Sequence, residues 1–530
     1  MSSPRSVPGR TDHVVVVGAG FSGLAAALHL LGAGRRVTVL ERAPHPGGRA
    51  GRLDLHTSRG RYAADPGPTV LTMPELLDEA FAAVGERTAD RLELIELDPA
   101  YRAQFADGST IDVHADPAAM EAEVRRACGP AAADGYQRLR DWLGELYRAE
   151  IDTFIGANHD SPLGLLGPDL LRLARLGGFG RLGPRVARFV PDERLQRIFS
   201  FQALYAGVPP DRALAAYGVI AYMDTVRGVF FPRGGMRRIG TALADAAVAA
   251  GAEIHYGRTV TGLERTLGRV RAVRHGATDD PRGPLERTAG DAVVLTADLP
   301  VTYRLLGRSP RRPLRLRYAP SAVVLHAGLR RRRPALAHHT ISFGAAWRRT
   351  FQEIIDDGRP MSDPSLLVTR PTATDPELAP PDSDLLFLLA PCPNLTRSGL
   401  DWAEFGPRYR DLLLAELARR GRPELADLAD DIEISRLVTP ADWAADGLAA
   451  GTPFSLAHTF SQTGPFRPGN LVGGWENVVL AGCGTTPGVG IPPVLISGRL
   501  AAQRITGGPG RSRRVPNTGP DRAMGTWIAS

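Results

Sequence analysis

The stretch from Asp12 to Arg49 constrains the fold of this chain more strongly than any other segment. Val14–Val17 has the β-branched composition of a short strand that is buried on both faces. The glycine-rich turn Gly18–Gly23 follows, and the alanine- and leucine-rich segment after it is a predicted helix. A second predicted strand, Arg36–Leu40, leads directly into Glu41. This order of strand, turn, helix and strand predicts a dinucleotide-binding unit, because a GxGxxG pattern has that meaning only in such a context.

Each glycine of the pattern has a physical task. Gly18 permits the tight turn, Gly20 lets the backbone approach a pyrophosphate, and Gly23 lets the helix pack closely on the strand. Around Ala19 and Ser22, the start of the helix would present N–H groups and a partial positive charge to the phosphates. The alternative is an ordinary glycine turn before a helix. The matching spacing of strand, small helix residues and terminal acidic residue favours the dinucleotide.

The residues after the second strand distinguish NAD from FAD. Glu41, 18 residues after the last glycine of the pattern, can accept hydrogen bonds from a pair of ribose hydroxyls. Arg42 comes next, and the turn Pro46–Arg49 follows. A glycine pair and an arginine soon after the acidic residue form the extension that FAD-binding folds carry and NAD-binding domains generally lack. An ordinary turn would explain the glycines, but Gly48 and Arg49 in step with the acidic residue favour FAD.

The composition is that of a soluble globular protein. The chain has 530 residues, 43% of them hydrophobic and 23% charged, which is enough for two or three domains. All 64 basic residues are arginine, which a GC-rich genome explains better than a function does. The net charge of +7 suits an anionic surface. Because no nucleic-acid motif accompanies the charge, we expect a membrane surface, and no nucleic acid, as a partner.

Other features bear on the compartment. Three cysteines, far apart and without a CxxC pair, predict neither a disulfide framework nor a metal site and fit a reducing cytoplasm. The N-terminus lacks the apolar run of a signal peptide, so residues 1–11 are expected to be a disordered leader. No stretch approaches the ~20 apolar residues that a membrane span requires.

The region from residue 116 to 227 is predicted to be helical, including Pro117–Cys128 and Ala132–Ile155. Between Ser161 and Val190, arginines stand among three leucines that share one helical face, Leu166, Leu170 and Leu173. Such a basic amphipathic segment can lie flat in a membrane interface. It can equally be a surface helix with its apolar face on the core, and both interpretations stay open.

The remainder is predicted to return to the first domain and to add a second sheet. Residues 228–299 contain a predicted helix and four predicted strands, namely Met236–Ala250, Ala252–Tyr256, Thr259–Glu264, Val270–Arg274 and Asp291–Asp298. These make the FAD-binding domain discontinuous, with Val260 offering its backbone to the adenine. Residues 300–465 fit a substrate domain on a mixed sheet. Within it, Arg330–Arg333 is expected to be a solvated turn, and His338 with His339 lacks the third ligand of a metal site.

The last motif begins with a predicted strand at Val478–Ala481, continues with a glycine-rich loop, Gly482–Gly490, and ends in a helix that starts near Pro492. Proline is well tolerated in the first turn of a helix. Such a helix start can stabilise negative charge on the pyrimidine end of a reduced flavin.

With both ends considered, the chain resembles the bacterial-type carotenoid desaturases, most closely the phytoene desaturases, over nearly its whole length. The resemblance rests on the first motif and on further segments, namely DPGPTVLT from Asp65, FSF from Phe199, GVFFPRGGM, LAHHTISFG from Leu336, LDW from Leu400 and the loop from Gly482 to Val494. Two positions depart from the family pattern. Pro66 stands where the family often has alanine, and Thr486 where it commonly has histidine, so a side-chain role at Thr486 is in doubt.

The resemblance implies an α/β fold with a discontinuous Rossmann-like FAD-binding domain, a mixed-sheet substrate domain and a helical membrane-facing region. The expected FAD-binding parts are 12–115, 228–299 and 466–506, the helical region is 116–227, the substrate domain is 300–465, and 507–530 is a disordered tail. The implied cofactor is non-covalent FAD, and the implied substrate is a long-chain isoprenoid, phytoene. We expect a cytoplasmic protein that is peripherally associated with the inner face of the cell membrane, with quinone or oxygen as electron acceptor.

The expected cofactor-binding residues are Gly18, Ala19, Gly20, Ser22, Gly23, Glu41, Arg42, Gly48, Arg49, Gly67, Pro68, Thr69, Val70, Val260, Gly482, Gly490, Ile491, Pro492 and Val494. Hydride transfer to flavin N5 and loss of a proton would need positioning and a dry tunnel rather than a catalytic dyad. The catalytic side chains are therefore unknown, with Asp65, Arg148 and His338 as polar candidates that also have structural interpretations. The alternatives are a flavin amine oxidase on the same fold and a non-enzymatic isoprenoid-escort protein.

Overall fold

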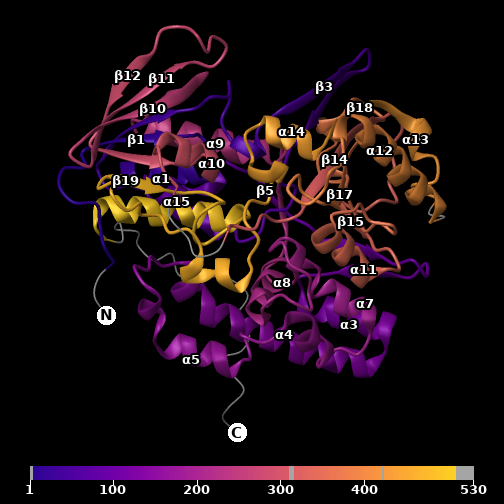
Figure 1. Ribbon diagram of the computed structural model, residues 1–530. Coiled ribbons are helices and arrows are strands. Elements are labelled where there is room, and N and C mark those ends of the chain that lie inside the picture. Colours follow the sequence, from indigo (N-terminus) through magenta and orange to yellow (C-terminus); the bar gives the residue numbers. More distant parts are fainter. Residues whose placement is uncertain (1–3, 310–314, 421–422, 509–530) are drawn as a thin grey trace.

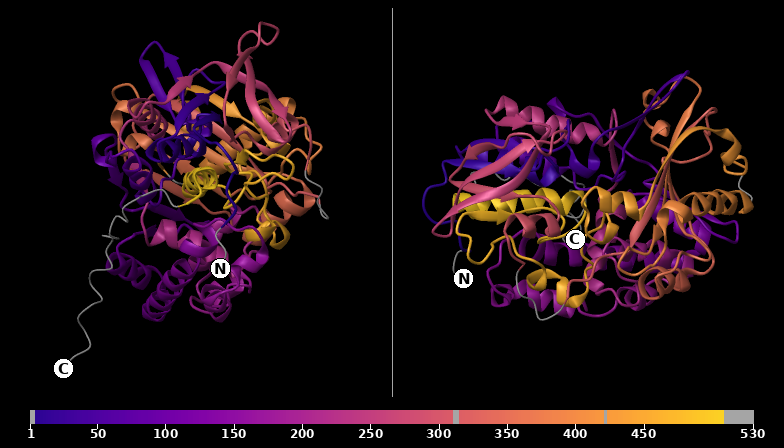
Figure 2. Two further views of the ribbon diagram at one scale, coloured as in Figure 1. Left: turned by 90° about the vertical axis from the view of Figure 1, so that its left-hand side faces the viewer. Right: turned by 45° about the horizontal axis from the view of Figure 1, so that its top comes forward.

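The computed structural model describes residues 4–309, 315–420 and 423–508 (Figure 1). The prediction of a disordered tail concerns 507–530, and from 509 onward it lies outside the described residues. In Figure 1 and in the right view of Figure 2, the five-stranded parallel sheet and the larger mixed sheet form two upper lobes, and the helical region lies beneath both.

The first sheet is parallel and combines three distant parts of the chain. Its order is β19-β13-β1-β2-β9. These strands are Val478–Leu480 (β19), Ala292–Leu295 (β13), His13–Val17 (β1), Arg36–Leu40 (β2) and Glu253–His255 (β9). Successive valines of β1 face opposite layers, with Val14 and Val16 against helices and Val15 and Val17 against a second, smaller sheet. The predicted strand, buried on both faces, is confirmed.

Helices cover one face of this sheet, and an antiparallel sheet covers the other. The helices are α1 (Phe21–Gly32), α9 (Arg237–Ala249) and α15 (Ile491–Thr506). The antiparallel strands are β10 (Arg258–Thr266), β11 (Arg269–Ala277) and β12 (Glu286–Ala289). Helices α1 and α15 approach closely, because a Cβ added at Gly498 would stand 2.3 Å from the Ser22 carbonyl oxygen.

The N-terminal leader packs against the rest of the fold. Val7 is buried and its N–H donates to the Arg504 carbonyl at 2.7 Å, so that expectation was wrong for the described part of the leader.

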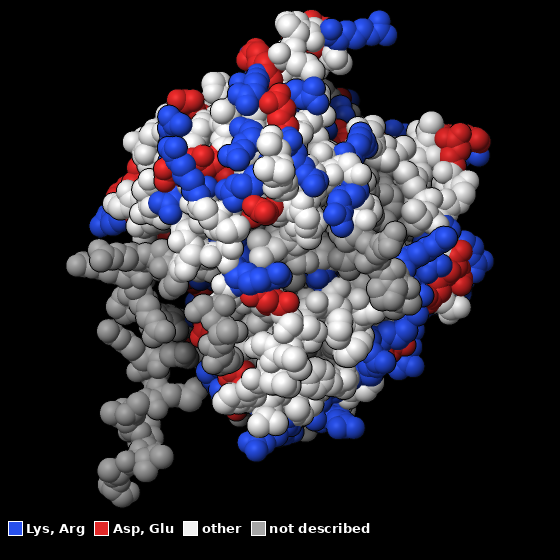
Figure 3. Space-filling view, turned by 60° about the vertical axis from the view of Figure 1, so that its left-hand side comes forward, with Lys and Arg blue, Asp and Glu red and all other residues white. Residues whose placement is uncertain are grey.

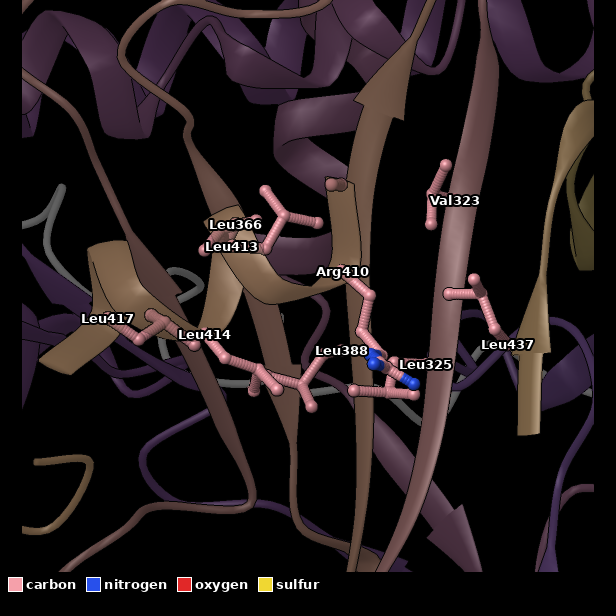
Figure 4. Close-up of a pocket in the computed structure, with 10 residues that line it drawn as sticks. Val323, Leu325, Leu366, Leu388, Arg410, Leu413, Leu414, Leu417 and Leu437 are labelled. Atoms are coloured by element: carbon pink, nitrogen blue, oxygen red, sulfur yellow. The ribbon is translucent and has the colours of Figure 1, made fainter. Parts of the chain in front are cut away.

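The larger, mixed sheet has seven strands in the order β18-β14-β17-β16-β15-β6-β7. Its strands are antiparallel except where β15 runs parallel to β6. They are β6 Tyr101–Gln104, β7 Thr110–Val113, β14 Ser321–Leu329, β15 His339–Ser342, β16 Leu366–Thr369, β17 Asp384–Cys392 and β18 Ile432–Val438. Helix α12 (Trp402–Arg419) covers its outer face. A small apolar gap between that helix and the sheet is lined by leucines and by the stem of Arg410 (Figure 4). Nothing reactive faces this gap, so we interpret it as imperfect packing.

Beneath both sheets lies the helical region, α3 (Pro117–Cys128), α4 (Pro130–Glu150), α5 (Pro168–Arg175), α6 (Leu182–Ala187), α7 (Glu193–Ile198) and α8 (Gly218–Thr225). The predicted bounds of α3 are confirmed, and Asp116 caps it by accepting a hydrogen bond from Ala119 N at 2.8 Å. Helix α4 ends earlier than predicted, because the chain continues from it into a wider π-type turn, Ile151–Ile155.

The remaining elements are short. They are β3 Leu53–Thr57, β4 Gly60–Ala64, α2 Glu75–Ala82, β5 Leu94–Glu96, β8 Phe230–Pro232, α10 Leu299–Leu305, α11 Trp347–Phe351, α13 Leu428–Asp431 and α14 Pro440–Ala445. No helix in the described part of the chain is both long and apolar enough to cross a membrane.

One sequence expectation in the second lobe was wrong. Arg330–Arg333 is not simply a solvated turn, because Arg333 is only 7% exposed. Its guanidinium lies 2.8 Å from Asp431 and 2.6 Å from Asp427. Its backbone N–H also donates to Asp384 at 2.5 Å. These partners lie 51 to 98 residues away in the sequence, so the charge run alone could not reveal them.

Arg333→Met should destabilise the second lobe. Without Arg333, the buried Asp431 carboxylate keeps only the exposed Arg331 as a cationic partner, at 3.0 Å. The lost hydrogen bonds to this carboxylate should cost about 1–3 kcal/mol of unfolding free energy. A lower midpoint of thermal unfolding, followed by tryptophan fluorescence, is the expected result. The matched control is Arg332→Met, which changes the exposed neighbour in the same turn. Equal midpoints for the two variants would show that the buried ion pair does not contribute to stability.

Candidate functional site

The glycine-rich turn between β1 and α1 contains glycines of two kinds. Gly18 has φ +107°, and a Cβ there would stand 2.3 Å from Thr296 Oγ1. A Cβ at Gly23 would stand 2.0 Å from the Gly18 carbonyl oxygen. The chain itself therefore requires these two glycines. At Gly20 the added Cβ would meet only Gly48 Cα, at 3.9 Å, so the space above Gly20 is open.

A second glycine turn lies directly against the first. Gly47 N donates to the Ala19 carbonyl at 2.9 Å, and a Cβ at Gly48 would stand 3.1 Å from Gly20 Cα. A Cβ at Gly240 on α9 would stand 2.7 Å from Gly47 Cα. Backbone thus meets backbone across three segments, and the surface they share carries no side chains.

Glu41, the acidic residue that follows β2, stabilises the backbone at these glycine turns. Glu41 is buried, and its carboxylate accepts hydrogen bonds from Ala19 N at 2.6 Å and Ala43 N at 2.8 Å. Its neighbour Arg42 does not point toward the turns. The Arg42 side chain is exposed and donates to the Asp446 carbonyl at 2.6 Å, near the end of α14. Val260 is half-buried on β10, two residues after Arg258, whose N–H donates to the Glu41 carbonyl at 2.7 Å.

Arg49 connects the second turn with two other predicted segments. A Cβ at Gly67 would stand 2.2 Å from the Arg49 carbonyl oxygen, so the loop of Gly67, Pro68, Thr69 and Val70 passes directly over Arg49. The guanidinium lies 3.9 Å from Asp298 Oδ2. Burial opposes its charge, but the neighbouring Cys483 and Asp298 outweigh burial and raise the pKa of Arg49. The Arg49 side chain keeps 27% of its surface accessible, so it is not fully enclosed by protein atoms.

The three polar candidates for catalysis have structural partners. Asp65 is buried and accepts hydrogen bonds from Met236 N at 2.9 Å and Arg237 N at 3.1 Å, at the start of α9. Burial nevertheless raises the pKa of Asp65 to about 6. Arg148 is half-exposed and pairs with Glu145 on the same helix.

The third candidate, His338, is buried in the second lobe. Its Nδ1 lies 2.6 Å from Thr374 Oγ1, and burial lowers the pKa of His338 well below its ordinary value. The adjacent His339 bonds to Thr369 Oγ1 at 2.9 Å. The described residues contain no cluster of three histidine, cysteine or carboxylate side chains that could hold a metal.

The loop before α15 is held by residues that the sequence analysis did not single out. Ser497 Oγ accepts a hydrogen bond from Gly482 N at 3.0 Å and donates to the Thr486 carbonyl at 3.1 Å. The buried Arg467 donates to the carbonyls of Cys483 and Thr485, at 2.6 and 3.0 Å. Arg467 belongs to no motif, and Ser497 lies in the helix of the last motif without a signal of its own, so neither was identified. A weak signal existed for Thr296 and Asp298, which lie in the last three residues of the predicted strand Asp291–Asp298. They follow the observed strand β13 and therefore lie at the carboxyl edge of the sheet.

Two helices begin here with free ends. Gly20 is the N-cap residue of α1 and Gly490 that of α15, and neither helix has a capping side chain or an acidic residue in its first turn. The following residues Ile491 and Pro492 are buried, and Val494 is half-buried. Both helix starts therefore offer uncompensated positive ends to an anion. Together with the open space at Gly20 and the partly accessible Arg49, these ends fit the pyrophosphate and flavin of FAD.

Comparisons with known proteins agree with this geometry. The family model of flavin-containing amine oxidoreductases matches residues 21–506. A phytoene dehydrogenase of Streptomyces griseus is 65% identical over 97% of this chain and 99% of its own length. A zeta-carotene-forming phytoene desaturase of Myxococcus xanthus is 38% identical over 93% of each chain. Among solved structures, cyclohexylamine oxidase from Brevibacterium oxydans superposes with a TM-score of 0.56 at 15% identity, covering 94% of this chain and 99% of that one.

The last comparison concerns the fold alone, whereas the sequence relatives define the branch. The family resemblance noted in the sequence is therefore confirmed, as are the flavin cofactor and the α/β fold of flavin-dependent oxidoreductases. The chain belongs to the phytoene desaturases, FAD-dependent oxidoreductases within the family of flavin-containing amine oxidoreductases.

Proposed function

We propose that this enzyme desaturates phytoene stepwise, to neurosporene or lycopene, in carotenoid biosynthesis. The observation that carries the proposal is the 65% identity to a phytoene dehydrogenase over nearly the full length of both chains. FAD supplies the hydride acceptor, N5, and we propose quinone or oxygen as the final electron acceptor. The cation left on a polyene is allylic, so the substrate itself delocalises the charge and the protein's main task is positioning.

The proposed cofactor site follows the residues that meet at the glycine turns. The first turn and the start of α1 would bind the pyrophosphate, Glu41 the ribose, and Val260 the adenine. Arg49, the loop of Gly67–Val70 and the segment Gly482–Val494 would surround the flavin. We drop Arg42 from this set, because its guanidinium is bonded to Asp446.

Aromatic side chains of the helical region suit an apolar substrate. Two of these residues, Tyr205 and Tyr217, lie deep in the protein yet remain half-buried. Tyr147 and Tyr222 stack with ring centroids 4.8 Å apart between α4 and α8. Such side chains support a polyene more than a small polar amine, the rival substrate on the same fold. The other alternative, a non-enzymatic escort protein, would have no need for two uncapped helix starts at an open glycine turn.

We also propose that an exposed apolar patch docks on membranes. It consists of Leu163, Leu166, Leu171 and Phe179, which are 73, 60, 61 and 49% exposed. This patch replaces the leucine face expected from the sequence, because Leu173 is buried against α4. The side of the molecule that Figure 3 brings forward has a lower region mainly of uncharged residues, bordered by both basic and acidic side chains. A C40 hydrocarbon is essentially insoluble in water, so the enzyme must draw it from a bilayer.

Gly20→Val should abolish flavin binding, because its side chain would fill the space in which a pyrophosphate approaches the backbone. The fold should survive, since Gly20 has φ −71° and meets only Gly48. We expect the flavin-to-protein absorbance ratio to fall about tenfold or more. The control is Gly399→Val, in an exposed loop that is also open. A folded Gly20→Val protein with full flavin would refute the proposed site.

Purified holoenzyme should convert phytoene in liposomes into more conjugated products, with FAD as the only added organic cofactor. Absorption spectra and chromatography of the extracted products measure the conversion. The same preparation should leave primary amines unoxidised, as judged by peroxide formation. Flavin-loaded protein that oxidises an amine and leaves phytoene untouched would favour the amine oxidase instead.

Replacement of the patch leucines, Leu163→Ser with Leu171→Ser, should weaken binding to anionic liposomes in a sedimentation assay. Arg175→Glu with Arg188→Glu should also weaken it, most strongly at low salt, since each exposed arginine contributes roughly 1 kcal/mol at an anionic surface. Arg172 and Arg185 are unsuitable for this test. Arg172 pairs with Glu145, and Arg185 lies 5.5 Å from the ring centroid of Trp142. Unchanged binding in both double variants would place the membrane surface elsewhere.

A further inference from the structure

His458 differs from the other deeply placed histidines. Its imidazole Nδ1 lies 3.0 Å from the Tyr217 hydroxyl, and the two rings meet edge to face with centroids 5.4 Å apart. The Tyr217 hydroxyl also bonds to Thr463 Oγ1. Two backbone hydrogen bonds hold the chain at this residue. His458 N donates to the Ala206 carbonyl at 2.7 Å, and Ala457 N donates to the Arg317 carbonyl at 3.0 Å. The orientation of this ring is therefore fixed.

The opposite edge of the ring faces the loop before α15. A Cβ added at Gly488 would stand 2.4 Å from His458 Cε1 and 2.8 Å from Nε2. The imidazole thus occupies the place of a side chain at Gly488, in the loop that the proposed function assigns to the flavin. Arg467, which holds this loop through the Cys483 and Thr485 carbonyls, is its nearest cation.

The Nε2 atom is the free end of this arrangement. Among the described residues it has no hydrogen-bond partner, and protein atoms do not cover it completely. The Nε2 atoms of His326, His338 and His339 also lack partners, but protein atoms seal them completely. His458 lies deep in the molecule. Its Nε2 atom therefore stays partly accessible within the fold, beside the loop that contains Gly488.

We propose that His458 Nε2 accepts the proton that the substrate loses in each desaturation; this assignment rests on the proposed function. One C–H bond surrenders its hydrogen with both electrons to the oxidised flavin, which is thereby reduced. The neighbouring C–H bond breaks, its electron pair becomes the new C=C bond, and its proton binds Nε2. Nδ1 carries the other proton and donates to the Tyr217 oxygen, while the Tyr217 hydroxyl donates to Thr463 Oγ1. In this tautomer the lone pair of Nε2 is free to accept a proton.

The surroundings of the His458 imidazole favour its neutral form. Burial and the charge of Arg467 lower the pKa of His458 well below its ordinary value. The other ionisable groups toward this cluster are Tyr217 and, beyond it, the buried Glu150. Burial raises the pKa values of both groups and so opposes a negative charge on either of them. The base form of His458 is therefore present at and above pH 6.5, and it is lost only as the pH falls through the lowered pKa.

The test uses anaerobic single turnovers of holoenzyme with phytoene-loaded liposomes, followed by flavin bleaching. The His458→Gln enzyme should keep its full flavin content, but its flavin should bleach about 100-fold more slowly than that of the wild type. We expect the bleaching rate of the wild-type enzyme to fall as the pH drops below 6.5, in an acidic limb of the pH profile. The His458→Gln enzyme should lack this limb. Tyr217→Phe should move that limb to lower pH, because the hydrogen bond that stabilises imidazolium is gone. His56→Gln, on the exposed strand β3, is the matched control and should behave as wild type.

A second measurement does not depend on turnover. In apo protein labelled at histidine Cε1, the NMR signal missing from His458→Gln should shift when FAD is added, since Cε1 lies against Gly488. The proposal would be overturned by a His458 signal whose chemical shift does not change when FAD is added. It would also be overturned if the His458→Gln enzyme bleached at the wild-type rate and with the wild-type pH dependence. Wild-type protein that never bleaches with phytoene would instead refute the proposed function, and the NMR shift would still decide whether the imidazole lies at the cofactor.

Discussion

The flavin-binding half of the molecule depends on how closely three backbone segments approach one another around Gly20. The turn after β1, the turn before Arg49 and the start of α9 are in contact through Gly20, Gly47, Gly48 and Gly240. A single methyl group at Gly240 would meet Gly47 Cα at 2.7 Å and force the segments apart. Because no side chain intervenes, backbone N–H groups and two uncapped helix starts are what this surface presents. That is the chemistry an extended diphosphate requires.

Local patterns in the sequence predicted this half of the fold well. Four valines and a glycine turn are sufficient to indicate β1 and α1, because their physical causes lie within about 20 residues. The same holds for α3, where Asp116 and Pro117 mark the start of the helix. What the sequence could not predict were partners far along the chain. The burial of Arg333 depends on Asp427 and Asp431, and that of Val7 depends on Arg504.

The candidate site shows the same division. Its motif residues meet in the structure, but the residues that hold them in place were invisible because each stands alone in the sequence. Arg467 acquires its role only through the carbonyls of the loop before α15, and His458 only through Tyr217 and Gly488. Side-chain direction was a further limit. Leu171 and Leu173 lie two residues apart on a short helix, yet one faces solvent and the other is buried.

The first sheet also has a consequence for the order in which the molecule can assemble on the ribosome. Strands β1 and β2 are synthesised at once, β9 and β13 much later, and β19 only at residues 478–480. Sheets built from such distant segments fold slowly, because long loops must close before native contacts form. The loop and helix that complete the cofactor site come later still, with α15 ending at Thr506. Nascent chains therefore expose an unfinished parallel sheet for most of their synthesis, and FAD can stabilise the protein only once nearly the whole polypeptide has emerged.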